Sequence, residues 1–266
     1  MKRKIVSIFL VAALLTACGY RPPERTEESY EPAQTVTETA CVTVPPTEES
    51  VPPTTEPEVT EPQITAPAAL PEMLEANGSS LQELTGLACM QLVTVAVEGT
   101  EAQIDLYLLE NNQWQRQELL SCGGYVGKNG AVDEKREGDK CTPRGLYSIE
   151  QAFYFAEAPV TGLPTFQITK DTYWVDDPES KYYNKRVEGT ENQDWTSAEH
   201  MYRYSKSYEY GFVVGYNVEA VPYAGSAIFF HVSDHPTAGC IATDREFVLQ
   251  YLAVLDETKN PYIIID

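Results

Sequence analysis

Residues 229–241 read Phe-Phe-His-Val-Ser-Asp-His-Pro-Thr-Ala-Gly-Cys-Ile and join an apolar run to a helical pattern. A thiol becomes a nucleophile when a nearby imidazole takes its proton. Gly239, beside the thiol, lets backbone N–H groups approach an oxyanion as it forms. The stretch therefore predicts that Cys240 is a nucleophile and His231 its base. The plainer alternative is a buried Cys240 and a hydrogen-bonded His231 with structural roles only.

A zinc site is the competing interpretation of the same stretch. His231, His235 and Cys240 are three nitrogen or sulfur ligands at close spacing, and zinc accepts such sets. Two His four residues apart share a face only in a helix, and Pro236 disfavours the helical conformation at His235. We therefore expect no metal, and we keep zinc as the alternative.

Downstream of Cys240 the sequence predicts one clear helix. Thr243 and Glu246 have the spacing of a capping box. Apolar residues then recur at i, i+3, i+4 and i+7, namely Val248, Tyr251, Leu252 and Leu255. This helix is expected to end before residue 260. A shorter helix is expected to begin near residues 197–200.

Most of the remaining chain is predicted to be β structure. Short runs rich in Val, Ile, Tyr and Phe alternate with Gly, Asn and Pro, which is typical of strands and turns. Residues 99–102 suit a hairpin between the first two runs. Residues 135–145 are expected to form a scaffold loop that shapes a cleft. The predicted strands are 91–98, 103–109, 146–150, 166–169, 211–216, 227–232 and 262–265.

The N-terminal part predicts export and attachment to a membrane. Residues 1–18 have a basic start, an apolar run too short to span a bilayer, and small residues before a cut site, which describes a signal peptide. Leu-Thr-Ala before Cys18 resembles the bacterial lipobox, in which the Cys takes a lipid. Residues 19–80, rich in Pro, Thr and Glu, predict a disordered tether. We expect the folded domain at residues 81–266.

Charge and cysteine content limit the classes of function. The chain has 40 Asp and Glu against 19 Lys and Arg, a net charge of −21, so it lacks the basic footprint of a nucleic-acid-binding protein. Export permits disulfides among Cys41, Cys89, Cys122 and Cys141. The pairing stays open, with Cys122–Cys141 as the preferred bridge.

Several segments together resemble one protein family. Residues 227–243 resemble the active-site motif of the L,D-transpeptidases of bacterial cell walls (the YkuD-type catalytic domain), in which a strand His precedes an S/T-x-G-C segment. Residues 135–147 are similar to the family's K-x-G-D-x-x-T-P-x-G-x-Y/F segment. The resemblance covers roughly residues 90–266. Further similar segments, in the expected order, are 127–130, 173–177, 183–184, 194–195 and 216–217.

The resemblance implies a mainly β, antiparallel β-sandwich-like domain with a few short helices, and a cysteine acyltransferase. Cys240 would attack a tetrapeptide stem after the L-centre of its diamino acid, releasing D-Ala and leaving a thioester. A second stem's amine would resolve it, or water would, as in an L,D-carboxypeptidase. His231 would be base and later acid, its tautomer fixed by the carbonyl of Val232 or Ser233. The N–H groups of Gly239 and Cys240 are the expected oxyanion donors.

The chain departs from the family pattern at two positions. Ala238 replaces a His before Gly-Cys, and Ala242 replaces an Arg or Asn after it. Other groups are then needed to recognise substrate. The residues assigned to substrate binding are Thr237, Ser233, Lys128 and Arg245.

Partners and location follow from the same resemblance. It implies peptidoglycan stem peptides as substrates and no cofactor. We expect a monomer outside the cytoplasm, anchored to the membrane through lipid on Cys18 and facing the cell wall. The alternative function is a catalytically inactive peptidoglycan-binding lipoprotein with the same fold. Sortases and papain-like peptidases fit less well, since they separate His and Cys widely or place Cys first.

Overall fold

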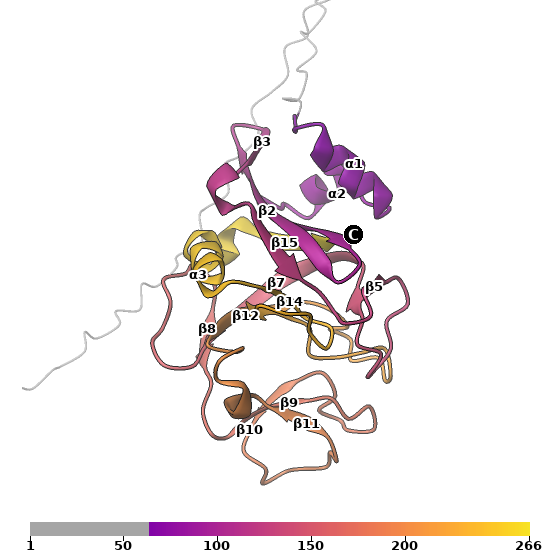
Figure 1. Cartoon of the computed structure of the whole chain (residues 1–266), viewed down its shortest axis with the longest axis vertical. Coiled ribbons are helices and arrows are strands. Elements are labelled where there is room, and N and C mark those ends of the chain that lie inside the picture. Colours follow the sequence, from indigo (N-terminus) through magenta and orange to yellow (C-terminus); the bar gives the residue numbers. More distant parts are fainter. Residues whose placement is uncertain (1–63) are drawn as a thin grey trace, which may run out of the picture. The chain divides into compact units, whose positions relative to one another are not determined.

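The structure is a computed structural model that describes residues 64–266 (Figure 1). These residues belong to one compact unit, Glu58–Asp266. The predicted signal peptide, the lipidation site at Cys18, Cys41 and the tether up to residue 63 lie outside the described residues. No helix in the described part of the chain is long and apolar enough to cross a membrane.

A closed β-barrel forms the body of this unit (Figure 1). Eight strands make the ring, and it closes because β1 pairs with β2 on one side and with β15 on the other. In ring order the strands are β1 (Gln91–Glu98), β15 (Pro261–Ile265), β7 (Gly145–Tyr154), β12 (Tyr210–Val214), β13 (Phe229–Val232), β14 (Ile241–Thr243), β4 (Cys122–Tyr125) and β2 (Glu101–Glu110). Two more strands extend the sheet, β3 (Gln113–Arg116) on β2 and β8 (Thr165–Gln167) on β7.

The prediction of a mainly β domain is confirmed. The sheet differs from the expected antiparallel sandwich in two ways. It closes on itself, and it is mixed, because the pairs β1–β15, β13–β14 and β7–β8 are parallel. The hairpin between β1 and β2 is confirmed, with Glu98 paired to Glu101 across a turn at Gly99 and Thr100.

One helix, α3 (Arg245–Val254), packs against β12 and β13. Its predicted apolar face is confirmed, since the four predicted side chains are fully buried. The capping box is wrong by one residue: Asp244 is the N-cap, and no side chain caps the helix. Thr243 instead ends β14, where its hydroxyl donates to the Gly123 carbonyl at 2.8 Å. The buried residues of this face are Val248, Tyr251, Leu252 and Leu255.

A separate three-stranded sheet lies apart from the barrel in Figure 1 and consists of β10 (Arg186–Glu188), β9 (Thr172–Val175) and β11 (Ala198–His200). The helix predicted near residues 197–200 is therefore wrong. Residues 198–200 pair with β9 over three positions, and a short 3₁₀ helix, η2 (Met201–Tyr204), follows them. Tertiary pairing overrides a weak helical pattern here.

Two N-terminal helices cover another apolar cluster. They are α1 (Ala69–Ala76) and α2 (Leu81–Gly86), and the side chains of Leu70, Leu74 and Leu84 are buried against Trp114. α1 lies within residues 19–80, for which the sequence predicts a tether, and it contributes to this cluster. The remaining short elements are η1 (Glu118–Leu120), β5 (Ala131–Val132), β6 (Thr142–Pro143) and η3 (Glu257–Lys259).

Candidate active site

Cys240 stands immediately before β14, at the wall of a cavity. Its side chain is 6% exposed. The sulfur accepts a hydrogen bond from the Phe229 amide at 3.4 Å and donates one to the Ala227 carbonyl at 3.3 Å. The thiol proton is therefore held by a backbone carbonyl.

His231 lies on β13, the strand parallel to β14, and is as buried as Cys240. Its Nδ1 lies 3.0 Å from the Val232 carbonyl. A carbonyl only accepts, so Nδ1 carries the proton and Nε2 is left as a base. The contact agrees with the predicted use of a backbone carbonyl to fix the tautomer, which stays a prediction.

The Cys240 thiol and the His231 imidazole lie near each other, but no hydrogen bond joins them in the part of the chain that the structure describes. Ala242, two residues beyond Cys240, pairs with His231. Tyr208 packs its ring edge against the imidazole, with ring centres 5.3 Å apart, and belongs to the same buried cluster as Cys240. His231 thus lies on β13 and Cys240 directly precedes the paired strand β14, while Tyr208 contacts the first and shares a buried cluster with the second.

Burial sets the resting charge of this pair. It lowers the pKa of His231 to about 4, since a buried imidazolium loses hydration. Burial also raises the pKa of the Cys240 thiol, and the nearby carboxylate of Glu199 raises it further. At neutral pH the site therefore holds a neutral imidazole and a neutral thiol.

Gly239 is required by the backbone next to the thiol. Its φ is +148°, and a Cβ there would lie 2.9 Å from the Cys141 carbonyl oxygen. Its amide, an expected oxyanion donor, donates to the Thr237 hydroxyl at 3.1 Å. That donor is therefore engaged within the loop in this state.

Two threonine hydroxyls hold the backbone on either side of the thiol. Thr237 donates to the Cys240 carbonyl at 2.6 Å. Thr142, which is fully buried, donates to the Gly239 carbonyl at 2.7 Å and accepts from the Gly127 amide at 2.8 Å. The sequence did not single out Thr142, although it lies within the family-like segment 135–147. Both hydroxyls fix the position of the nucleophile's peptide unit.

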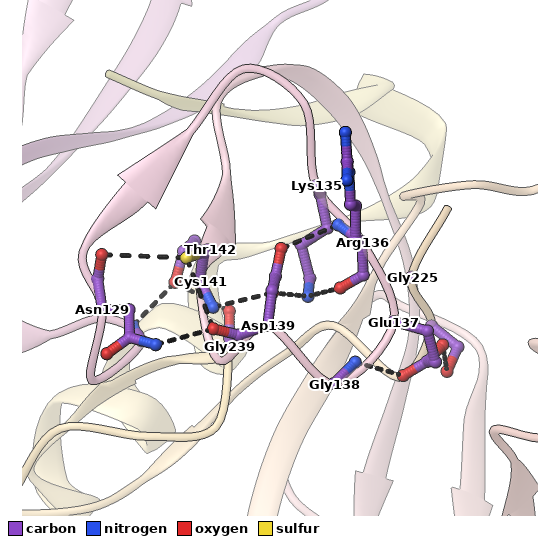
Figure 2. A network of polar contacts seen from close by, with 12 residues as sticks. Asn129, Lys135, Arg136, Glu137, Gly138, Asp139, Cys141, Thr142, Gly225 and Gly239 are labelled. Atoms are coloured by element: carbon purple, nitrogen blue, oxygen red, sulfur yellow. Dashed lines mark hydrogen bonds and ion pairs between the residues drawn. The ribbon is translucent and has the colours of Figure 1, made fainter. Parts of the chain in front are cut away.

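Residues of the loop before Thr142 line the cavity. Figure 2 shows the polar contacts within this loop. Asp139 accepts from Lys135 Nζ at 2.6 Å and from the amides of Arg136 and Cys141. The aliphatic part of Lys135 lies against Gly225 and Gly239. The predicted scaffold role of this loop agrees with these contacts, because Asp139 and Lys135 bond to groups within the loop.

The cavity at Cys240 has a volume of about 210 Å³ and is lined by three carboxylates and by two lysines, Lys135 and Lys140. Glu137, Asp176 and Glu199 line it, and none of them was singled out as a site residue from the sequence. Glu199 accepts a short hydrogen bond from the Tyr208 hydroxyl. Burial, followed by the charges of Asp176 and Glu137, raises the pKa of Glu199 to about 7.

The other predicted binding residues lie outside this cavity. Ser233 bonds to His235, and Arg245 pairs with Glu209 at 2.9 Å. Lys128 is exposed, and only its amide reaches the nucleophile loop, donating to the Thr237 carbonyl at 2.9 Å.

The three ligands of the alternative zinc site do not come together in the structure. His235 turns to Asp234, with Nδ1 at 2.7 Å from the carboxylate, rather than toward the other two ligands. Among residues 64–266, no group of three His, Cys, Asp or Glu side chains is placed to hold a metal ion.

The preferred disulfide Cys122–Cys141 is wrong for this structure, in which both cysteines are free. The two sulfurs have different neighbours. The sulfur of Cys122 lies 3.5 Å from the Thr243 hydroxyl, and the sulfur of Cys141 lies beside the Asn129 carbonyl. Cys89 is also free and buried.

Comparison with known proteins bears on this geometry. The family profile described as YkuD, L,D-transpeptidase catalytic domain, matches residues 95–264. Two solved structures of the helical cell shape determining protein Pgp2 from Campylobacter jejuni, one of them a mutant, are similar at 15% sequence identity, with TM-scores of 0.36 and 0.34. Each match covers 66% of this chain and 47% of the Pgp2 chain, so the present chain spans about half the length of these structures. No curated protein matches the sequence. Because the family match spans more than half of the chain and contains both His231 and Cys240, the chain belongs to the YkuD family of L,D-transpeptidase catalytic domains.

Proposed function

We propose that this protein is a peptidoglycan L,D-transpeptidase that forms cross-links, or trims stems, through a thioester on Cys240. The observation that carries the proposal is the position of Cys240, at the wall of a cavity with His231 on the adjacent parallel strand. Membership of the family supplies the reaction class.

In the proposed reaction, Cys240 Sγ attacks the carbonyl carbon of the diamino acid residue in a tetrapeptide stem. His231 Nε2 takes the thiol proton and gives it to the departing amine as the bond to D-Ala breaks. The amine of a second stem then attacks the thioester, which forms the new amide and restores the thiol. Attack by water gives a free carboxyl group instead.

The resting hydrogen bonds define what must change when substrate binds. The thiol proton must leave the Ala227 carbonyl for His231, and the Gly239 amide must leave Thr237 to stabilise the oxyanion with the Cys240 amide. Thr142 keeps the Gly239 carbonyl fixed while this amide turns. We propose Thr142 and Thr237 as positioning residues.

The location of the reaction forms part of the same proposal. Peptidoglycan lies outside the cytoplasm, which agrees with the signal-like residues 1–18. Lipid on Cys18 would hold the catalytic domain at the membrane. The Pro-rich segment would be the spacer that lets the domain extend from the membrane to the cell wall. We propose that Lys128, exposed beside the nucleophile loop, contacts the stem outside the cavity.

Acylation of the intact protein tests the proposal. Purified protein incubated with a tetrapeptide stem is expected to gain the acyl mass, located at Cys240 by peptide mapping. Cys240→Ser and His231→Ala should each reduce acylation by several orders of magnitude, since thiol and base act as a unit. His235→Ala is the matched control and should retain most of the rate, because His235 is exposed and turned to Asp234.

The alternative is an inactive wall-binding protein, which the substitutions at Ala238 and Ala242 favour. Ala242 is fully buried in the barrel. Binding of stem peptides by a folded protein whose Cys240 does not acylate would establish that alternative and overturn the enzymatic proposal.

A further inference from the structure

We propose that Asp176 and Glu199 form a subsite for the side-chain ammonium group of the donor peptide, beside Cys240. The donor residue meant here is the one whose carbonyl carbon Cys240 attacks. The inference rests on the proposed function and adds to it the chemistry by which this chain recognises that residue.

The small three-stranded sheet presents these carboxylates to the barrel. Glu199 on β11 pairs with Trp174 on β9, so the two share one face of the sheet, and Asp176, two residues beyond Trp174, continues that face. The ring centres of Trp174 and Phe229 lie 4.9 Å apart, and the Phe229 amide donates a hydrogen bond to the sulfur of Cys240. The cavity is therefore lined by carboxylates of the small-sheet region and by the thiol at the barrel.

Both carboxylates have unused hydrogen-bonding capacity. Asp176 Oδ1 is buried and has no hydrogen-bond partner within residues 64–266. One oxygen of Glu199 accepts from Tyr208, and no ion pair reaches either carboxylate in this part of the chain. A buried carboxylate oxygen without a donor is costly, so a cationic donor from a ligand would be stabilised there.

Two lysines, Lys135 and Lys140, also line the cavity, and no ion pair within residues 64–266 joins either of them to Asp176 or Glu199. Lys135, which is 8% exposed, uses its ammonium on Asp139 and on the Arg136 carbonyl. Glu137 accepts from Tyr183 and Ser226 and adds a third negative charge at the cavity. Three carboxylates therefore line the cavity with two lysines, and one of these lysines is already paired with Asp139, so negative charge is in excess beside Cys240.

The dimensions and donor set favour an ammonium group as occupant. The cavity of about 210 Å³ is lined by the thiol itself, so any group in it is close to the attacked carbonyl. A primary ammonium is a compact head with three donors, which suits two carboxylates that approach from neighbouring strands.

Occupation of this subsite would also affect the nucleophile. The negative charge of Glu199 disfavours the Cys240 thiolate. An ammonium bound between Glu199 and Asp176 cancels that repulsion, and it does so only when the donor residue is in place. Recognition of the substrate and formation of the thiolate are thereby coupled.

The test compares two synthetic tetrapeptide stems that differ only at the donor side chain, where the amine is either free or acetylated. The rate of Cys240 acylation is measured by intact mass at pH 8 for the full chain and for Asp176→Asn and Glu199→Gln. The wild type should prefer the free amine on the order of tenfold or more, because a desolvated charge pair is lost on acetylation. Each variant should reduce this ratio to within about threefold. Asp171→Asn, an exposed residue of the same sheet region that does not line the cavity, should keep the wild-type ratio.

The outcomes separate this inference from the proposed function. Equal acylation by the two peptides in the wild type would overturn the ammonium subsite while leaving the transpeptidase proposal intact. An unchanged ratio in both folded variants would do the same. Failure of both peptides to acylate the wild type would overturn the proposed function and this inference with it. Where a variant does not fold, the comparison of the two peptides in the wild type can still overturn the ammonium subsite.

Discussion

At the scale of single residues, the site is a neutral pair held apart by the backbone. The thiol of Cys240 is bonded to Ala227, and the imidazole of His231 is bonded through Nδ1 to Val232. Neither group is charged at neutral pH, since burial lowers the pKa of the imidazole and raises that of the thiol. The proposed proton transfer between them therefore starts from two neutral groups.

Glu199 gives a prediction about stability. Its pKa in the folded protein, about 7, is above its ordinary value of 4.5, so the folded state binds a proton more tightly than the unfolded chain. Stability should therefore fall as the pH rises from about 4.5 to about 7, where the unfolded state has already lost this proton. Glu199→Gln cannot ionise and still accepts from Tyr208.

The variant should gain stability over wild type between pH 5 and pH 8, by roughly 1–3 kcal/mol at the higher pH. Denaturant unfolding at the two pH values measures the difference, with Glu191→Gln, exposed and outside the cavity at Cys240, as the control. A difference that does not change with pH would contradict the assignment of this ionisation to Glu199.

At the scale of elements, sequence patterns located most strands but not their partners. Residues 91–98 form β1 as predicted, because alternating apolar side chains specify a strand locally. The first residue of α3 was misplaced because Thr243 bonds across the barrel to Gly123, a contact 120 residues away in sequence. Residues 198–200 became a strand only because β9 offers an edge. Local periodicity carries no information about such contacts between residues far apart in the sequence.

The element-scale prediction concerns Thr142, which links three segments. Thr142→Val keeps the volume but removes the donor to Gly239 and the acceptor for Gly127, leaving buried groups unsatisfied. We expect a loss of about 1–3 kcal/mol in unfolding free energy. The rate of Cys240 acylation should fall beyond what the unfolded fraction explains.

Thr142→Ser retains the hydroxyl and should recover most of the acylation rate. Rates measured at a temperature where both variants are fully folded separate the positioning role from stability. Equal rates for the Val and Ser variants would show that the Gly239 carbonyl needs no fixed partner.

At the scale of the whole molecule, the candidate site is assembled from four distant parts of the chain. His231 and Cys240 could be predicted from the sequence because they lie in one motif. Asp176, Glu199 and Thr142 were not, since their relation to the thiol depends on how the small sheet and the loop pack on the barrel. The sequence could indicate the chemistry of the motif. It could not indicate which residues of other elements surround the thiol.

The N-terminal helix supplies the prediction at this scale. Leu74 on α1 is fully buried against the barrel, so Leu74→Ala should lower the unfolding free energy by about 2–5 kcal/mol. Glu75→Ala, one residue further and exposed, should change it by less than about 0.5 kcal/mol. A chain that begins at residue 81 lacks α1 entirely and should be less stable than one that begins at residue 64. Thermal unfolding of the four proteins measures this, and equal stability of the two truncated chains would mean that α1 does not belong to the folded domain.

The closure of the ring by β15 has a consequence for how this protein must be made. Ile263, Ile264 and Ile265 are fully buried, and their strand lies between β1 and β7, which come from much earlier in the chain. Until residues 261–265 arrive, both of those strands present open edges that can pair with other chains. Such non-local pairing is slow, and the unfinished barrel is the state most exposed to aggregation. Completion of the ring therefore depends on residues 261–265, which cover both of these edges.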